Sequence, residues 1–292
     1  MQLSENVLLL GNRHFNYFLV GKKEAAIIEC GVSGGVYSFQ KQWEKLHQKP
    51  EVKYLVAMHA HFDHVCGIPA LQKMFPAAVL LASSPAEAVL KKAKIMENFF
   101  AQDEKMLDLL ADEGIIPRGL QSPNVTEIAL DKLIAEGDEI KLGGDLNIKV
   151  LDAPGHSPCS LACYLPAEQV MFISDACGFQ ISDEDIFPVF FQAYDIYLET
   201  IKRLMSYPSK LLAIPHERIW TGRNIDAFYR RALSSAEQAF NIIRDLLDQG
   251  WEDEKIEKEL FARYYKGSLK IYTPENIQQC VQILLRRVKE KL

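Results

Sequence analysis

The sequence of 292 residues lacks the features that mark membrane-spanning and disulfide-stabilised proteins. Its six cysteines form no C-x-x-C pair and no regular framework, so we interpret them as free thiols. No apolar run approaches the roughly 18 residues that cross a bilayer. The first residues, MQLSENVLLLGN, have no basic stretch before their short apolar run, unlike a secretion signal. We therefore expect a cytoplasmic protein with no membrane partner.

The chain also lacks an excess of positive charge. It has 33 basic and 39 acidic residues and a formal net charge of −6, which argues against a nucleic-acid partner. The hydrophobic share of 48% and the charged share of 25% are typical of globular proteins. The length suggests about two domains or one large domain with an appendage. The expected partner is a small-molecule substrate, and a homodimer is left open.

Strand and helix patterns alternate over the first 220 residues or so, and helical patterns alone follow. Short apolar runs predict strands over 7–10, 17–20, 25–28, 53–58, 160–164, 170–173 and 211–214, with a further alternating stretch over 141–150. Helical periodicity predicts helices over 34–49, 68–74, much of 85–115, and 197–205. Three more are predicted over 224–249, 252–265 and 273–292. We therefore expect a mixed α+β domain followed by a helical tail.

Histidine is scarce, yet it is concentrated at one point. The chain has seven histidines, and three of them fall within HAHFDH, directly after a predicted strand, as His59, His61 and His64. Neutral imidazoles together with a carboxylate, here Asp63, are the ligands that a divalent transition metal prefers. On a tight turn, His59 and His61 can reach one metal while Asp63 and His64 reach a second. The alternative is a polar loop whose histidines are satisfied by hydrogen bonds.

HAHFDH resembles the H-x-H-x-D-H signature of the metallo-β-lactamase superfamily of hydrolases. Three later motifs match the same family in order and spacing. GHSPCS supplies His156, MFISDA supplies Asp175 after an apolar strand, and LLAIPH supplies His216 after another. The resemblance covers about residues 1–220. It implies a four-layer αββα sandwich over residues 1–222 with a helical insert at about 85–125. The helical extension over 223–292 would then cover the mouth of the active site.

The resemblance also implies the site and its chemistry. The implied cofactors are two divalent metal ions, the first held by His59, His61 and His156, the second by Asp63, His64 and His216, with Asp175 bridging them. A hydroxide held by such a pair attacks a carbonyl or phosphoryl group. Asp63 is expected to be the catalytic residue that orients the hydroxide and shuttles a proton. Zinc is the default metal, but a site without thiolate also suits iron or manganese.

Cysteines occupy positions near these motifs that the family usually fills with small residues or glycine. Cys66, Cys159 and Cys177 lie in HVCG, GHSPCS and SDACG, and Cys30 follows Glu29 in IECG, where the family often has a D-x-G turn. Cysteine is small and packs well in tight loops. The alternative is that thiols near the metals make the site sensitive to oxidation or favour a softer metal.

An aromatic segment downstream of Asp175 is a candidate wall for the substrate pocket. Its members are Phe187, Phe190, Phe191, Tyr194 and Tyr197. Because positions 190, 194 and 197 share helical spacing, a core stripe is the alternative. The layout resembles the thioesterase branch, most of all the quinolone-signal response protein and more distantly glyoxalase II. A glutathione site would use residues of the tail such as Arg223, Tyr229, Arg230, Arg231 and Lys266.

The expected function is therefore hydrolysis of a thioester or similar activated carbonyl, of the acyl-CoA or glutathione thioester class. A lactonase would use the same metals. A nuclease or phosphodiesterase fits the acidic charge less well. A flavodiiron reductase would need an acidic residue in place of His61 and a flavodoxin domain. The alternative that is not an enzyme is a binding or regulatory protein that keeps the metals as structure.

Overall fold

The apolar runs pair into two six-stranded sheets. The computed structural model describes residues 1–123 and 125–292. The first sheet has the order β1-β2-β3-β4-β5-β6, antiparallel up to β3 and parallel from β3 onward. Its strands are β1 (Val7–Gly11), β2 (Asn16–Val20), β3 (Glu24–Ile28), β4 (Glu51–Val56), β5 (Val79–Ala82) and β6 (Lys132–Leu133).

The second sheet has the order β14-β13-β10-β9-β8-β7, and only its β10–β13 pair is parallel. Its strands are β7 (Glu139–Lys141), β8 (Asn147–Asp152), β9 (Leu161–Leu165), β10 (Val170–Phe172), β13 (Leu211–Ala213) and β14 (Ile219–Thr221). A separate two-stranded ribbon joins β11 (Phe179–Gln180) and β12 (Ile186–Phe187).

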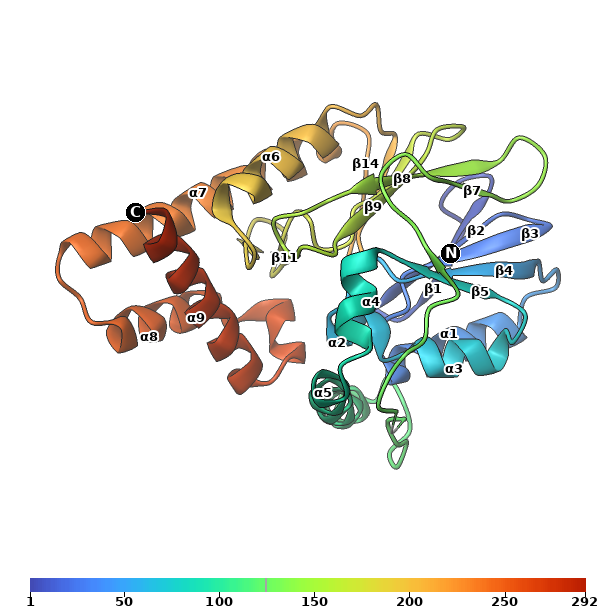
Figure 1. Ribbon diagram of the computed structural model, residues 1–292, viewed down its shortest axis with the longest axis horizontal. Helices are drawn as coiled ribbons and strands as arrows, with labels where there is room; N and C mark the ends of the chain where they lie inside the picture. The colour runs from blue at the N-terminus through green and yellow to red at the C-terminus, as the bar shows by residue number, and fades with distance from the viewer. Residues whose placement is uncertain (124) are drawn as a thin grey trace.

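The two sheets bury one face of each against the other. Side chains from both sheets form a common core, in which the rings of Phe18 and Phe172 meet edge to face at 5.3 Å between centroids. The outer faces carry helices: α1 (Ser33–Glu44) and α3 (Ile68–Met74) cover the first sheet, and α6 (Tyr194–Met205) covers the second (Figure 1). The predicted αββα sandwich of the α+β class is therefore confirmed.

The remaining helices lie at one edge of the sandwich and in the tail. Next to the first sheet are α2 (Phe62–Val65), α4 (Ser84–Leu90) and α5 (Ala93–Asp112). The tail contains α7 (Asn224–Asp248), α8 (Asp253–Tyr264), the 3-10 helix η1 (Gly267–Ile271) and α9 (Pro274–Lys291). In Figure 1 these orange and red helices stand together at one side of the sandwich. Across the described residues, no helix combines the length and the apolar character needed to span a membrane.

Some predicted boundaries were wrong for local reasons. The helix predicted over 34–49 ends at Glu44, where Lys49 Nζ donates to the carbonyl oxygen of Glu44 at 3.2 Å. Pro50 follows Lys49, and a proline disfavours the helical conformation in the residue before it. The sequence analysis missed β5, β6, β14 and the β11–β12 ribbon. These runs are four residues or shorter, and they are strands only because a neighbouring strand pairs with them.

A buried carboxylate ties the insert to the first helix of the sandwich. Asp103 of α5 is fully buried and accepts hydrogen bonds from Ser33 N at 3.0 Å, from Ser33 Oγ at 2.5 Å and from Ser122 Oγ. Burial raises the pKa of Asp103, although these hydrogen bonds oppose the shift. The carboxylate thus satisfies a backbone N–H at the start of α1 and fixes the chain that follows α5.

We expect Asp103→Ala to lower the free energy of unfolding by about 1–3 kcal/mol, because it leaves buried donors without an acceptor. Asp108→Ala is the matched control, since Asp108 is exposed on the same helix and should change stability by less than about 0.5 kcal/mol. Urea unfolding of both variants measures the difference. Equal losses would show that the Asp103 hydrogen bonds contribute nothing specific.

Candidate metal centre

Four chain segments bring the predicted site residues to one edge of the sandwich. His59 and His61 follow the end of β4, and Asp63 and His64 lie in the short helix α2. The loop between β8 and β9 carries His156. The remaining two follow the ends of strands that are paired in parallel: Asp175 after β10 and His216 after β13.

Among the described residues, two with positive φ that are not glycine lie in these loops, Ser174 (φ 47°) and Glu217 (φ 62°). A third, Glu29 (φ 73°), follows β3 and contacts His64. Side chains rarely adopt this left-handed conformation, and such strain concentrates at functional sites. Gly155 (φ 116°) precedes His156 and passes so close to α6 that a Cβ atom there would lie 2.4 Å from the Cα of Tyr197. The surrounding structure therefore holds the backbone around the site in energetically unfavourable conformations.

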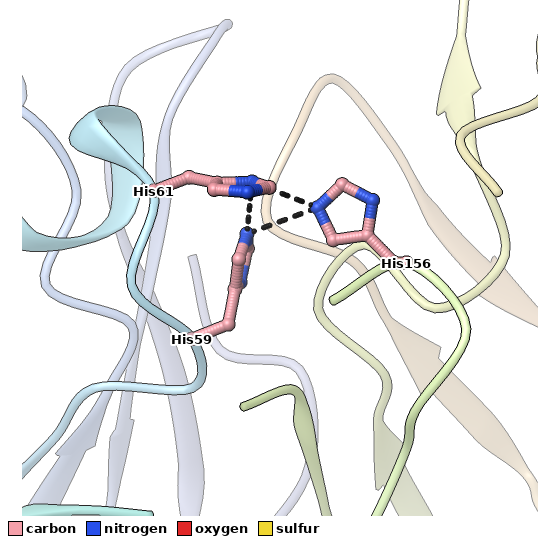
Figure 2. Close-up of side chains that lie close together, drawn as sticks. All are labelled: His59, His61 and His156. Carbon is pink, nitrogen blue, oxygen red and sulfur yellow. Dashed lines mark hydrogen bonds between the residues drawn. The ribbon is translucent and has the colours of Figure 1, made fainter. Parts of the chain in front are cut away.

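The first group of side chains is a triangle of imidazole nitrogens. His59 Nε2 lies 3.1 Å from His61 Nδ1, and His156 Nε2 lies 3.2 Å from the former and 2.9 Å from the latter (Figure 2). These donor atoms could hold a metal ion, since all lie within 4.8 Å of one another. The three rings come from two separate loops and point at one spot.

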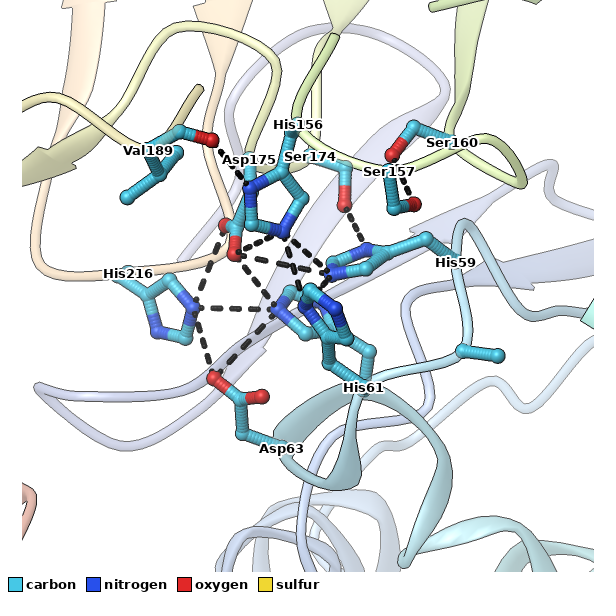
Figure 3. A network of polar contacts seen from close by, with 12 residues as sticks. His59, His61, Asp63, His156, Ser157, Ser160, Ser174, Asp175, Val189 and His216 are labelled. Atoms are coloured by element: carbon cyan, nitrogen blue, oxygen red, sulfur yellow. Dashed lines mark hydrogen bonds and ion pairs between the residues drawn. The ribbon is translucent and has the colours of Figure 1, made fainter. Parts of the chain in front are cut away.

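A second group lies beside the first, and Asp175 touches both. It comprises Asp63, His64, Asp175 and His216, whose donor atoms also lie within 4.8 Å of one another. Figure 3 shows Asp63, Asp175 and His216 of this group beside the first group. Asp175 Oδ2 is 3.3 Å from His64 Nε2, and it is 3.7 Å and 3.6 Å from the Nε2 atoms of His59 and His156. The structure thus brings together all seven residues predicted as ligands, with Asp175 between the two groups.

Most of the rings are fixed from behind through their other nitrogen. His156 Nδ1 donates to the carbonyl oxygen of Val189 at 3.0 Å, and His216 Nδ1 donates to that of His14 at 3.0 Å. His59 Nδ1 lies 3.1 Å from Ser174 Oγ. Hydrogen bonds of this kind set the tautomer and orientation of metal-binding histidines.

His64 has a charged partner. Its Nδ1 lies 2.8 Å from Glu29 Oε2, and both side chains are buried. A carboxylate behind an imidazole is a common outer partner in metal sites, and it raises the basicity of the ring. Burial opposes protonation of His64, but the carboxylates of Glu29 and Asp175 outweigh it and raise its pKa well above the usual value.

His64 and His216 present their Nε2 atoms to each other. A carbonyl oxygen only accepts, so His216 carries its proton on Nδ1 and offers a lone pair at Nε2. His64 Nε2 lies 3.4 Å away. Because the pKa of His64 is raised, this nitrogen carries a proton, and a divalent cation between the rings would take the place of that proton. Nitrogen and carboxylate donors so arranged fit a divalent metal ion.

The pKa shifts agree with this charge balance. Burial, together with His156, lowers the pKa of His61 to about 3, and burial lowers that of His59 well below the usual value. These rings are therefore neutral and free to coordinate. Burial acts against the charge on Asp175, but the surrounding histidines, His64 first, hold the pKa of its carboxyl well below the usual range. The centre thus retains negative charge in a buried place.

A cavity of about 310 Å³ opens directly on this centre. Phe187 and Phe191 line it, and Phe191 lies against the His156 ring at 5.3 Å between centroids. Phe190, Tyr194 and Tyr197 do not line this cavity. Phe190 precedes α6, Tyr197 lies on it, and both are fully buried. Tyr194 is half-buried and stacks on Phe240 of α7 at 4.4 Å. The structure therefore favours the core interpretation for Phe190 and Tyr197.

The cysteines near the site are packed into the core. Cys30, Cys66 and Cys177 are fully buried, and burial raises the pKa of each thiol above the ordinary value. Neither group of possible metal-binding side chains among the described residues includes a cysteine. Cys159 Sγ instead accepts a hydrogen bond from Ala60 N at 3.3 Å. The structure favours packing over a redox role.

Sequence reasoning missed the residues that support the ligands. Glu29 was noted only as a departure from the usual turn, and Ser174 was not singled out. Tyr272 was also missed, although its hydroxyl donates to Asp63 Oδ2 at 2.7 Å from the distant tail. The acidic residue directly after β3 was the one available signal for Glu29. Nothing local in the sequence marks Tyr272.

Comparisons with known proteins agree with the fold and with the motifs. Residues 11–216 match the model of the metallo-beta-lactamase superfamily. The metallo-beta-lactamase fold-containing protein ST1585 of Sulfurisphaera tokodaii is 23% identical over 230 residues, which cover 77% of this chain and 81% of that protein. The crystal structure of ST1585 superposes with a TM-score of 0.61 at 18% identity, covering 98% of this chain and 99% of the other.

A further solved structure has the same fold over almost the full length. The metallo-beta-lactamase family protein TTHA1429 from Thermus thermophilus superposes with a TM-score of 0.67 at 16% identity, covering 99% of this chain and 95% of the other. At these identities the likeness establishes the fold, whereas the family match extends over most of the chain and includes all four motifs. The chain belongs to the metallo-β-lactamase superfamily.

Proposed function

We propose that the protein is a metal-dependent hydrolase that cleaves a thioester or a similarly activated carbonyl. Superfamily membership and the possible metal-binding cluster support a hydrolase. In this proposal His59, His61 and His156 would hold one divalent ion, and Asp63, His64 and His216 would hold another, with Asp175 available to both. Such ions supply Lewis-acid activation of water and of the substrate's carbonyl oxygen. Zinc is our first choice, and iron and manganese suit the same donors.

The protein's own groups would position the reactants and move the proton. Asp63 lies at the floor of the cavity beside the second group, where its carboxylate can orient the attacking water and accept its proton. The hydrogen bonds behind His59, His156 and His216 keep the rings fixed while charge develops. Buried surroundings strengthen each of these electrostatic interactions relative to water.

The choice of substrate rests on which side chains line the cavity. Its walls between the metal centre and the surface are mostly apolar, with Phe99 of α5 and Ile283 of α9 joining Phe187 and Phe191. The polar lining away from the centre consists of amides: Asn98, Gln102, Asn276 and Gln279. Among the described residues that line it, none is a lysine or an arginine. An uncharged acyl group fits this cavity, with the carrier thiol extending toward solvent.

The tail residues considered for a glutathione site lie elsewhere. Tyr229 is buried, Arg231 stacks over Trp220 at 5.1 Å, and Lys266 pairs with Asp185 at 2.9 Å. None of them lines the cavity. This arrangement gives no support to a glutathione site on these residues. A lactone or ester with a neutral apolar part fits the same walls and remains the second candidate.

The ligand assignment predicts that His59→Ala lowers bound metal sharply, because it removes one nitrogen of the first group. His47→Ala is the matched control, since His47 is exposed and remote from the motifs. Elemental analysis of both variants after loading with Zn²⁺ or Mn²⁺ tests the assignment. If His59→Ala binds as much metal as His47→Ala, the assignment of the first group is wrong.

The substrate assignment predicts metal-dependent hydrolysis of acyl-CoA thioesters. A panel of acyl-CoA, lactone and bis-p-nitrophenyl phosphate substrates is to be assayed with zinc-, iron- and manganese-loaded protein. We expect Asp175→Ala to reduce thioester turnover by about 10²–10³-fold, a loss typical of removing one preorganised electrostatic group. His47→Ala should keep the full rate. Cleavage of the phosphodiester alone would overturn the thioesterase assignment. No cleavage of any substrate by fully metallated protein would favour a binding or regulatory role.

A further inference from the structure

Tyr272 reaches the metal centre from the tail. It lies between η1 and α9, and its side chain is buried. The ring meets Phe62 edge to face at 6.1 Å and Phe179 at 5.4 Å between centroids. These contacts hold the phenol beside α2, the helix that carries Asp63. Tyr272 is also part of the cavity lining.

The hydroxyl of Tyr272 is directed at one particular oxygen. It donates to Asp63 Oδ2 at 2.7 Å. The same oxygen faces the second group, at 3.6 Å from His64 Nε2 and 3.7 Å from His216 Nε2. A carboxylate oxygen has two lone pairs, so it can accept from the phenol and still offer the other pair to a cation.

The hydrogen bond to Asp63 comes from a different part of the chain than the hydrogen bonds to the histidines. The groups behind His59, His64, His156 and His216 are Ser174, Glu29, Val189 and His14. All four lie in the sandwich, before the tail begins. Over the described residues, Tyr272 is the one hydrogen-bond donor recorded for the Asp63 carboxylate. The orientation of Asp63 therefore depends on a segment more than 200 residues away.

We propose that Tyr272 is a positioning residue through which the tail completes the second half of the metal centre. This inference rests on the proposed function, because it assigns Tyr272 a role toward the proposed ligand Asp63. The phenol selects which carboxylate oxygen faces His64 and His216, and it restrains rotation of the Asp63 side chain. A tail displaced from the sandwich would leave Asp63 unrestrained and the second group incomplete.

Two other contacts keep Tyr272 in place. Tyr265 Oη donates to the carbonyl oxygen of Tyr272 at 3.0 Å, which fixes the backbone of the segment. Asn276 Nδ2 on α9 donates to Gln102 Oε1 on α5 at 2.7 Å, which joins the tail to the insert next to the cavity. These contacts explain how a residue so distant in sequence can be held within a fixed distance of Asp63.

The test is Tyr272→Phe, which keeps the ring packing against Phe62 and Phe179 but removes the hydroxyl. We expect binding of one metal equivalent to weaken by about 10–100-fold while the other is unchanged, as measured by titration of metal-free full-length protein with Zn²⁺ alone. With the most active thioester, kcat should fall by about 10–100-fold and KM should stay constant.

Tyr164→Phe is the matched control. It also removes one tyrosine hydroxyl and one hydrogen bond, at 2.7 Å to the carbonyl oxygen of Pro208, but Tyr164 lies in β9 and contacts neither Tyr272 nor Asp63. Tyr272→Phe with unchanged metal binding and kcat would overturn the proposal, and so would equal losses in both variants, which indicate a general loss of stability. If the wild-type protein binds two equivalents of metal but hydrolyses no substrate, the proposed function fails. The two metal titrations still decide the role of Tyr272 in that case.

Discussion

The structure depends on the burial of three carboxylates and four inward-facing Nε2 atoms at one edge of a sandwich. The side chains of Glu29 and Asp63 are buried, and that of Asp175 is 12% exposed, so the three carboxylates lie where water barely reaches. Burying an unpaired charge costs several kcal/mol, so such a group needs a positive partner. The pKa of His64 is raised and that of Asp175 is lowered, which shows that the cluster favours positive charge even without a metal. A divalent cation satisfies the same demand without a proton.

Local backbone strain accompanies this cluster of side chains. Ser174 and Glu217 adopt left-handed conformations next to Asp175 and His216, and Glu29 does so opposite His64. Each such residue costs of the order of 1–3 kcal/mol, and it persists only where the surroundings dictate it. Here the strands dictate it, because parallel pairing of β10 with β13 ends both strands at the same level. The strain therefore sets the directions of side chains that a relaxed loop would leave free.

The motifs and the strand ends were predictable from the sequence because they are local. Each of the motifs HAHFDH and GHSPCS contains its characteristic residues, at their characteristic spacing, within six consecutive positions. The supporting hydrogen bonds are not local: Glu29 lies 35 residues from His64, Ser174 lies 115 from His59, and Tyr272 lies 209 from Asp63. Only the packed fold brings such pairs together. Positions 190, 194 and 197 also have helical spacing, but only the fold shows that α6 begins at Tyr194 and that Tyr194 packs on Phe240 of α7.

The cavity connects this centre to the tail and thereby to specificity. One wall belongs to the insert through Phe99 and Gln102, and the opposite wall belongs to α9 through Asn276 and Ile283. Neither wall contains a residue of the two possible metal-binding groups, so both can vary in sequence without changing those groups. Tyr272 is the exception, because it belongs to the tail and also bonds Asp63. Under the proposed function, a tail that shapes the acyl pocket and orients Asp63 would couple substrate fit to the order of the metal centre. The helices that line the cavity would then also help to assemble the reactive site.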